Sequence, residues 1–116
     1  MSVTVRQAEA DDYDEIVSFT RDTWADRETT DYVPDVFHEW VETDGPTQRT
    51  FVATVDGDVA GLCQGVFLSD YETWAQGIRV DPSYRGEGVG NELTTAVFDW
   101  ARDRGATVCR NLVFSW

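Results

Sequence analysis

Lysine is absent from this sequence: all nine basic residues among the 116 are arginines. A Walker phosphate-binding loop requires Gly-Lys-Ser/Thr, so that site is excluded. Cysteine is scarce as well, with only Cys63 and Cys109, each inside an apolar stretch. We expect reduced core thiols in a cytoplasmic protein rather than a disulfide. No stretch approaches the roughly 18 apolar residues of a membrane span, and no signal-peptide pattern follows Met1.

The charge balance is strongly acidic. The 22 aspartates and glutamates give a formal net charge of −13. Nucleic acids and anionic membranes bind basic surface, so we expect neither as a partner. A lysine-free, aspartate-rich composition resembles that of halophilic proteins, in which salt screens the repulsion between carboxylates. We therefore interpret the charge as an adaptation to salt; an acidic surface for a cationic partner is the alternative.

The hydrophobic pattern predicts one α/β domain over residues 1–116. Apolar residues make up 41% and aromatic residues 13% of the chain, enough for a packed core. The predicted order is strand, helix, helix, three antiparallel strands, helix, strand. Strands are predicted at 3–6, 49–55, 58–68, 72–80 and 107–116, and helices at 10–24, 34–44 and 88–105. An Asp56-Gly57 turn joins the second and third strands as a hairpin.

The most specific local pattern is Arg85-x-x-Gly88-x-Gly90, at the junction of a strand and an amphipathic helix. A dinucleotide fingerprint beginning at Gly86 and Gly88 would need a third glycine where Asn91 stands, so it is excluded. The free N–H groups and positive dipole end of a helix start can hold a pyrophosphate, and Arg85 can add a charged fork. By itself, the pattern also fits a glycine-rich turn with a solvated arginine.

The stretch GIRVDPSYRGEGVG, residues 77–90, resembles the central signature of the GNAT family of acyl-CoA-dependent N-acyltransferases. The resemblance extends over essentially the whole chain in the order of its elements, and residues 78–90 are its specific part. It implies a mixed, largely antiparallel sheet flanked by helices. It also implies acetyl-CoA as cosubstrate, an amine of a small molecule or peptide as acceptor, and no metal.

The resemblance assigns coenzyme A to particular residues. The pantetheine arm would pair as an added strand with Ile78, Arg79 and Val80. The pyrophosphate would lie on the loop and helix start formed by Arg85, Gly86, Glu87, Gly88, Val89 and Gly90, with Asn91 at the edge.

The catalytic residues are less clearly indicated. Many family members carry a glutamate as general base on the strand before the glycine loop, and here the acid on that strand is Glu72. Glu72 is therefore the candidate base, with an exposed strand-end carboxylate as the alternative. Gln76, in the middle of the strand, has no titratable group and can at most position a water. His38, the sole histidine, is expected to be solvated.

The family pattern continues beyond the last predicted strand into a helix and two closing strands, whereas this sequence ends at Trp116. We therefore expect a C-terminally shortened domain. It is either a truncated product or fragment, or one copy of a homodimer joined through the exposed last strand. A non-catalytic module that binds coenzyme A or another protein is the alternative to an enzyme. A nucleotide-binding regulator of another fold is a third interpretation.

Overall fold

The computed structural model describes residues 3–20, 33–84 and 86–111. A sheet of five strands runs through the molecule in the order β1-β2-β3-β4-β5. The first four strands pair antiparallel, and the last joins β4 in parallel. The strands are β1 (Val3–Gln7), β2 (Gln48–Val55), β3 (Asp58–Phe67), β4 (Glu72–Val80) and β5 (Val108–Asn111). The predicted mixed, largely antiparallel sheet is confirmed.

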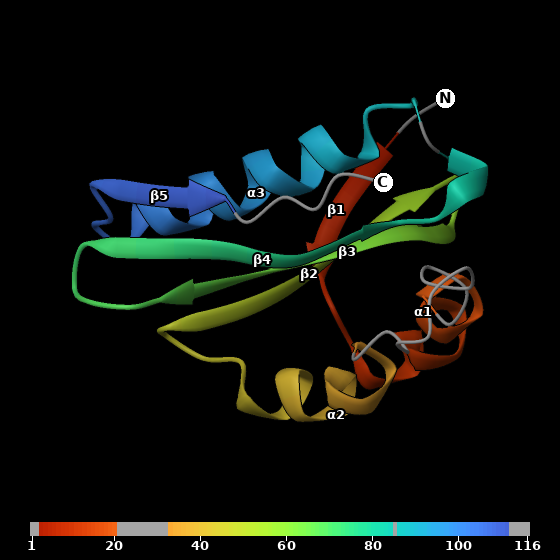
Figure 1. Ribbon diagram of the computed structural model, residues 1–116, viewed down its shortest axis with the longest axis horizontal. Helices are drawn as coiled ribbons and strands as arrows, with labels where there is room; N and C mark the ends of the chain where they lie inside the picture. The colour runs from red at the N-terminus through yellow and green to blue at the C-terminus, as the bar shows by residue number, and fades with distance from the viewer. Residues whose placement is uncertain (1–2, 21–32, 85, 112–116) are drawn as a thin grey trace, which may run out of the picture.

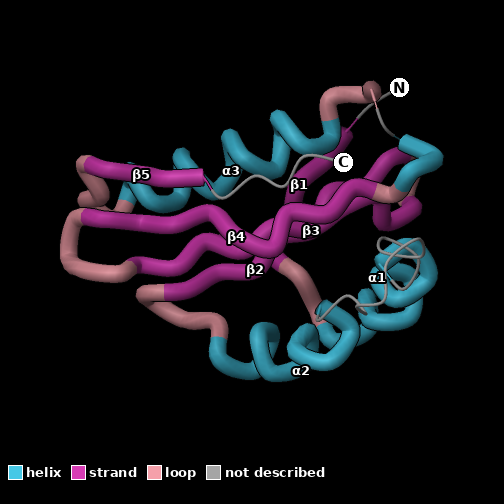
Figure 2. Tube along the Cα trace, in the orientation of Figure 1, coloured by secondary structure: helices cyan, strands magenta, loops and turns pink. Residues whose placement is uncertain are grey.

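Helices cover both faces of this sheet (Figures 1 and 2). The short 3-10 helix η1 (Ala10–Asp12) leads into α1 (Tyr13–Thr20), and α2 (Val33–Thr43) packs beside α1 on the same face. The long helix α3 (Val89–Asp103) crosses the opposite face and follows a second 3-10 turn, η2 (Pro82–Tyr84). The order of elements therefore forms three layers, with the sheet in the middle.

Two apolar clusters lie on the two faces of the sheet, because successive strand residues point to opposite sides. On β2, Phe51, Ala53 and Val55 belong to the cluster under α3. Val52 belongs to the cluster under α1 and α2. The α3 cluster includes Val89, Leu93, Val97, Trp100 and Ala101, and the α1–α2 cluster includes Ile16, Phe19 and Phe37.

The start of α3 lies unusually close to the sheet because β3 carries Gly61 there. A Cβ at this position would lie 3.0 Å from Leu93 Cδ1, 3.0 Å from Val89 Cγ1 and 2.7 Å from the backbone oxygen of Arg79. No side chain fits in that space. Gly61 therefore sets the distance between the first turn of α3 and the end of β4, the two elements that the glycine loop connects.

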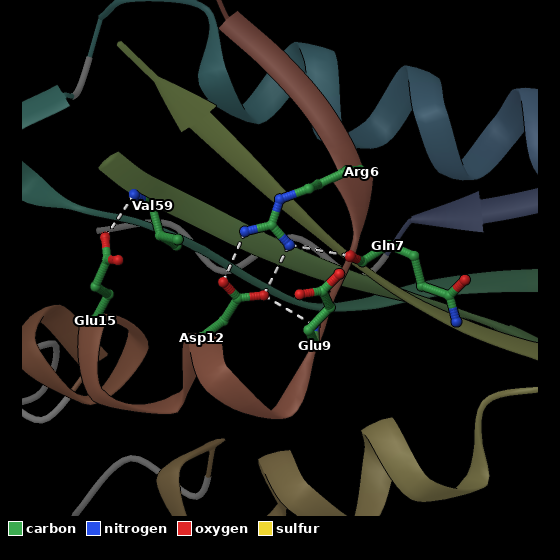
Figure 3. A network of polar contacts seen from close by, with 6 residues as sticks. All are labelled: Arg6, Gln7, Glu9, Asp12, Glu15 and Val59. Carbon is green, nitrogen blue, oxygen red and sulfur yellow. Dashed lines mark hydrogen bonds and ion pairs between the residues drawn. The ribbon is translucent and has the colours of Figure 1, made fainter. Parts of the chain in front are cut away.

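A polar network fastens the first helices to the sheet (Figure 3). The guanidinium of Arg6 on β1 donates to both carboxylate oxygens of Asp12, at 2.9 and 2.7 Å. The Glu9 amide donates to the same carboxylate at 2.8 Å. Glu15 on α1 accepts a hydrogen bond from the Val59 amide of β3 at 2.8 Å. This network holds α1 over one end of the sheet.

Most predicted elements agree with the structure. β4 has the predicted bounds, and Asp56 and Gly57 form the expected turn, with φ of 52° and 91°. The first predicted helix begins as η1, and its predicted end lies outside the described residues. The last strand is described only from Val108 to Asn111. Cys63 is a buried free thiol, whereas the side chain of Cys109 lies outside the described part. None of the described helices has the length and apolar character of a membrane span.

Candidate functional site

The start of α3 is an open helix terminus. The first N–H groups of an α-helix have no intrahelical partner, and here the Glu92 amide, donating to the Gly88 oxygen at 3.0 Å, begins the helical pattern. Gly88 occupies the N-cap position in the left-handed region, with φ of 82°, and contributes no side-chain hydrogen bond. A left-handed cap of this kind favours glycine. The helix start therefore presents main-chain N–H groups and a positive dipole end together.

A hollow of about 420 Å³ lies at this terminus. Four of its seven lining residues belong to the first turn of α3 or to its cap, and two more precede them in the loop and η2. The lining consists of Val80, Tyr84, Gly86, Gly88, Val89, Gly90 and Asn91. Because three of these residues are glycines, main chain forms much of the wall. A helix N-terminus with this access is a ready-made binding site for phosphate groups.

The strand that leads to the hollow contains a β-bulge. Gln76 pairs with Gln64 and Arg79 pairs with Leu62, so two residues of β4 stand opposite Cys63. The first of these two is Gly77, with φ of 66°. A bulge bends its strand and increases the local twist, and bulges are frequent next to active sites. The second half of β4 therefore runs in a different direction from the first half.

The two halves of β4 also differ in their pairing. On its β5 side, β4 pairs with Val108–Asn111 only along Glu72–Ala75. Among the described residues, no strand pairs with the second half of β4 on that side. Unpaired N–H and C=O groups at a sheet edge can accept an extended ligand as an added strand. This edge leads directly to the hollow at Val80.

The structure brings most of the predicted coenzyme A residues together, with three qualifications. Ile78 and Arg79 are only 7% and 2% exposed as whole residues, so their side chains are not available to a ligand along this strand. The Glu87 amide already donates to the Tyr84 oxygen at 3.3 Å, and Glu87 does not line the hollow. Arg85 lies outside the described residues.

Glu72, the candidate base, lies at the opposite end of β4 from the hollow. Val80 lies eight positions further along β4, roughly 26 Å at about 3.3 Å per residue. It stands where β4 leaves the β3–β4 turn, with its backbone oxygen accepting from the Leu68 amide at 2.8 Å. The structure therefore does not bring Glu72 to the hollow. Gln76 lies nearer, directly before the bulge at Gly77.

Within residues 3–20, 33–84 and 86–111, the remaining chemistry-bearing side chains do not form a metal site. His38 is exposed and stacks on the Tyr13 ring, with centroids 4.5 Å apart. Over the ranges that the structure covers, no group of three or more histidine, cysteine, aspartate or glutamate side chains could hold a metal ion.

A buried polar row was not predicted from the sequence. Thr50, Gln64 and Gln76 stand at paired positions on β2, β3 and β4, and they link to Asp44 after α2. Thr50 and Gln64 are 0% and 1% exposed. The sequence signal is a glutamine inside the mainly apolar stretch of β3 and another in the middle of β4, whereas Thr50 follows two other polar residues at the start of β2 and gives no such signal.

The chain is similar in sequence or in structure to several acetyltransferases. It is 27% identical over 131 aligned positions to a thialysine N-epsilon-acetyltransferase of Sus scrofa, covering 99% of this chain and 76% of the relative. It is 39% identical over 71 residues to a streptothricin acetyltransferase of Streptomyces lavendulae, covering 56% of this chain and 35% of the relative. The aminoglycoside N-acetyltransferase AAC(6')-Iy, solved with a bisubstrate analogue of coenzyme A and acetylneamine, has a TM-score of 0.75 at 21% identity.

That structural match covers 98% of this chain and 81% of the solved one, so the fold is shared over nearly the whole described molecule. At this identity the match shows the fold alone. The sequence profile of the acetyltransferase (GNAT) family matches residues 11–114 and therefore includes the strand, the glycine loop and the helix start described above. The chain belongs to the GNAT family of acetyltransferases.

Proposed function

We propose that this protein transfers the acetyl group of acetyl-CoA to a primary amine of a small molecule or peptide. The observation that carries the proposal is the open start of α3, where uncapped N–H groups and three glycines line one hollow at the end of β4. The comparisons support it: the relatives' names specify an amine of thialysine and of an aminoglycoside as acceptors. Which amine this protein acetylates is a separate question.

In this proposal the start of α3 and the end of β4 bind different parts of coenzyme A. The amides of Gly88, Val89 and Gly90 hold the pyrophosphate, because an anion at a helix N-terminus is stabilised by both hydrogen bonds and the dipole. The guanidinium of Arg85 adds a positive charge and can donate two hydrogen bonds to the phosphate oxygens. The pantetheine arm extends along the main chain of Ile78–Val80, on the β5 side of β4, beyond the residues of β4 that pair with the described part of β5.

The reaction is a direct displacement. The amine nitrogen attacks the thioester carbonyl carbon, a nitrogen–carbon bond forms, and the carbon–sulfur bond breaks. The proton lost by the amine is balanced by the proton gained by the departing sulfur, which leaves as the free thiol of coenzyme A. Main-chain N–H groups of β4 near the bulge are the donors that can stabilise negative charge on the carbonyl oxygen during the attack.

The test measures binding and turnover separately. Acetyl-CoA binding is measured by calorimetry and thiol release is followed with a panel of lysine analogues, aminoglycosides and peptides, in buffered KCl. We expect both for the unmutated chain and weaker acetyl-CoA binding for Arg85→Ala. Binding without turnover on any amine would favour the non-catalytic module. Absence of binding would overturn the proposal, and preferential binding of ATP or NAD would favour a different nucleotide ligand.

We further propose that two copies of the chain associate along β5. In the described residues β5 pairs with β4 alone, and Val108 at its start is 40% exposed. An unpaired strand edge is a template for pairing with another chain. Sedimentation in molar KCl should show a dimer that Val108→Asp weakens. A monomer at every concentration would contradict the association without affecting the proposed reaction.

A further inference from the structure

A continuous chain of side-chain hydrogen bonds crosses the sheet from a carboxylate to the middle of β4. Gln76 Nε2 donates to Gln64 Oε1 at 2.8 Å, and Gln64 Nε2 donates to Thr50 Oγ1 at 3.3 Å. Thr50 Oγ1 in turn donates to Asp44 Oδ1 at 3.0 Å. The chain therefore joins the loop after α2 to the residue before the β4 bulge.

The carboxylate at one end fixes the direction of every bond. Ionised Asp44 can only accept, so the Thr50 hydroxyl must donate to it and can then accept from Gln64. Gln64 must turn its amino group toward Thr50 and its carbonyl toward Gln76. Gln76 must then turn its own amino group toward Gln64. Buried polar groups with satisfied partners specify one arrangement, and here that arrangement is imposed across three strands.

Asp44 itself is held by several donors. Its Oδ2 accepts from the Thr50 amide at 3.0 Å, and its Oδ1 also accepts from Gln48 Nε2 at 3.0 Å. Gln48 Nε2 also donates to the Trp40 oxygen of α2, at 3.0 Å. The end of the hydrogen-bond chain is therefore fixed to both β2 and α2.

This chain of hydrogen bonds fixes the orientation of the Gln76 side-chain amide. Because its amino group is committed to Gln64, its Oε1 atom is the end of the side chain that remains to accept a hydrogen bond. Among the described residues no hydrogen bond to Gln76 Oε1 is recorded. Gln76 is half-buried, lies on the α1–α2 face with Gln64 and Thr50, and directly precedes the bulge where β4 turns toward the hollow.

We propose that Gln76 Oε1 accepts a hydrogen bond from the N–H of the acceptor amine and orients its lone pair toward the thioester. Asp44, Thr50 and Gln64 are positioning residues that hold the Gln76 amide in that orientation. This assignment rests on the proposed acetyl transfer. It requires a substrate that donates an N–H, and it places the acceptor on the α1–α2 face of the sheet.

The decisive variants remove one link at a time. Thr50→Val removes the hydroxyl while keeping the side-chain shape, and Thr50→Ser restores it. Gln76→Met removes the accepting oxygen with an unbranched side chain of similar length. Thr54→Val on the same strand is the matched control, since no side-chain hydrogen bond of Thr54 is recorded in the described part of the chain. Thermal unfolding and acetyl-CoA binding are measured for every variant.

We expect Gln76→Met to raise the KM for the amine about tenfold, the effect of leaving one donor unsatisfied, with acetyl-CoA binding unchanged. Thr50→Val should raise the same KM by a smaller factor, and Thr50→Ser should return it toward the unmutated value. In the Gln76→Met background, Thr50→Val should raise the KM no further. That non-additivity would show that Thr50 acts through Gln76. A general loss of stability would instead affect acetyl-CoA binding as well as the KM for the amine.

Two results overturn the assignment. If Thr50→Val and Gln76→Met change stability but leave the amine KM at the unmutated value, the row is a structural network only. If their effects on KM multiply in the double variant, Thr50 does not act through Gln76. A chain that binds acetyl-CoA normally but acetylates no amine would overturn the proposed function itself, and this assignment with it.

Discussion

Gly65 on β3 lies directly beneath the indole of Trp100 on α3. A Cβ at position 65 would come within 2.8 Å of Trp100 Cζ3 and 2.9 Å of Val97 Cγ1. Trp100 is only 7% exposed and packs edge-on against Phe67 and Phe51, with ring centroids 5.4 and 6.3 Å away. The indole therefore has little room to retreat. Together with Gly61, this contact lets α3 lie close against the sheet.

Gly65→Ala should lower the free energy of unfolding by about 1–3 kcal/mol, the usual cost of overpacking a core. Denaturant unfolding measures the loss. The control is Gly45→Ala, where the nearest atom to the added Cβ is the Thr43 oxygen at 3.9 Å, an ordinary contact. Equal stability of the two variants would show that α3 can move away from the sheet without cost.

The cap of α3 provides a test of the binding site. Gly88→Ala meets no atom within 4 Å, but its φ of 82° is strained for any side chain, at about 1–2 kcal/mol. Relief of that strain would turn the cap amides away from the hollow. We expect the dissociation constant for acetyl-CoA to rise about tenfold, measured by calorimetry.

The matched control for Gly88 is Gly105, just beyond the other end of α3. Gly105 has φ of 95° and also meets no atom within 4 Å. Gly105→Ala carries the same kind of backbone strain far from the hollow, so it should lower stability and leave acetyl-CoA affinity unchanged. If Gly88→Ala and Gly105→Ala weakened acetyl-CoA binding equally, the effect would come from general destabilisation and not from the cap of α3.

Glu72 can be tested as the general base directly. Removing a general base costs about 10²–10⁴ in rate. Since Glu72 lies five positions along β4 from Gly77 in the bulge, where we place the thioester, roughly 16 Å at about 3.3 Å per residue, we expect Glu72→Gln to keep kcat within about threefold of the unmutated value. A fall of more than a hundredfold, with loss of the acid limb of the pH–rate profile, would establish Glu72 as the base and require a different path for the ligand.

The sequence predicted the parts of this fold that local pattern controls. Period-two alternation located β4, and the Asp56-Gly57 pair located the hairpin, because both signals act over a few residues. The glycine loop was recognisable for the same reason. The polar row from Asp44 to Gln76 was not, since its members come from four separate segments. Only the strand register shows that they touch, and the β3–β4 register runs unbroken from the Phe67–Thr73 pair to the Gln64–Gln76 pair.

The contact between Arg6 and Asp12 predicts a pH dependence of stability. Burial acts to raise the pKa of the Asp12 carboxyl. The hydrogen bonds from Arg6 and the Glu9 amide, together with the guanidinium charge, outweigh burial and hold that pKa below its ordinary value. A carboxyl with a lowered pKa stabilises the fold above its unfolded-state pKa of about 3.9, and this contribution is lost as the pH falls through the folded value.

Asp12→Asn should therefore cost about 1–2 kcal/mol at neutral pH, with a difference from the unmutated chain that stays constant down to about pH 5 and shrinks below about pH 4. Urea unfolding across this range gives the difference at each pH. Asp11→Asn, at the exposed neighbouring position, is the control and should cost less than about 0.5 kcal/mol. A difference independent of pH down to 2 would show that the carboxylate charge does not contribute.

The acidic composition predicts the response to salt. With 22 carboxylates against nine arginines, repulsion among surface charges opposes the compact state. Raising KCl from 0.1 to about 1 M shortens the Debye length from about 10 to 3 Å, so the midpoint of thermal unfolding should rise with salt. Two variants that each replace a negative charge with a positive one, Asp14→Lys and Asp99→Lys, should reduce that rise. Both positions are exposed, and only Asp99 has a recorded ion pair, 3.5 Å to Arg102. A midpoint that falls or stays level with KCl would contradict salt adaptation.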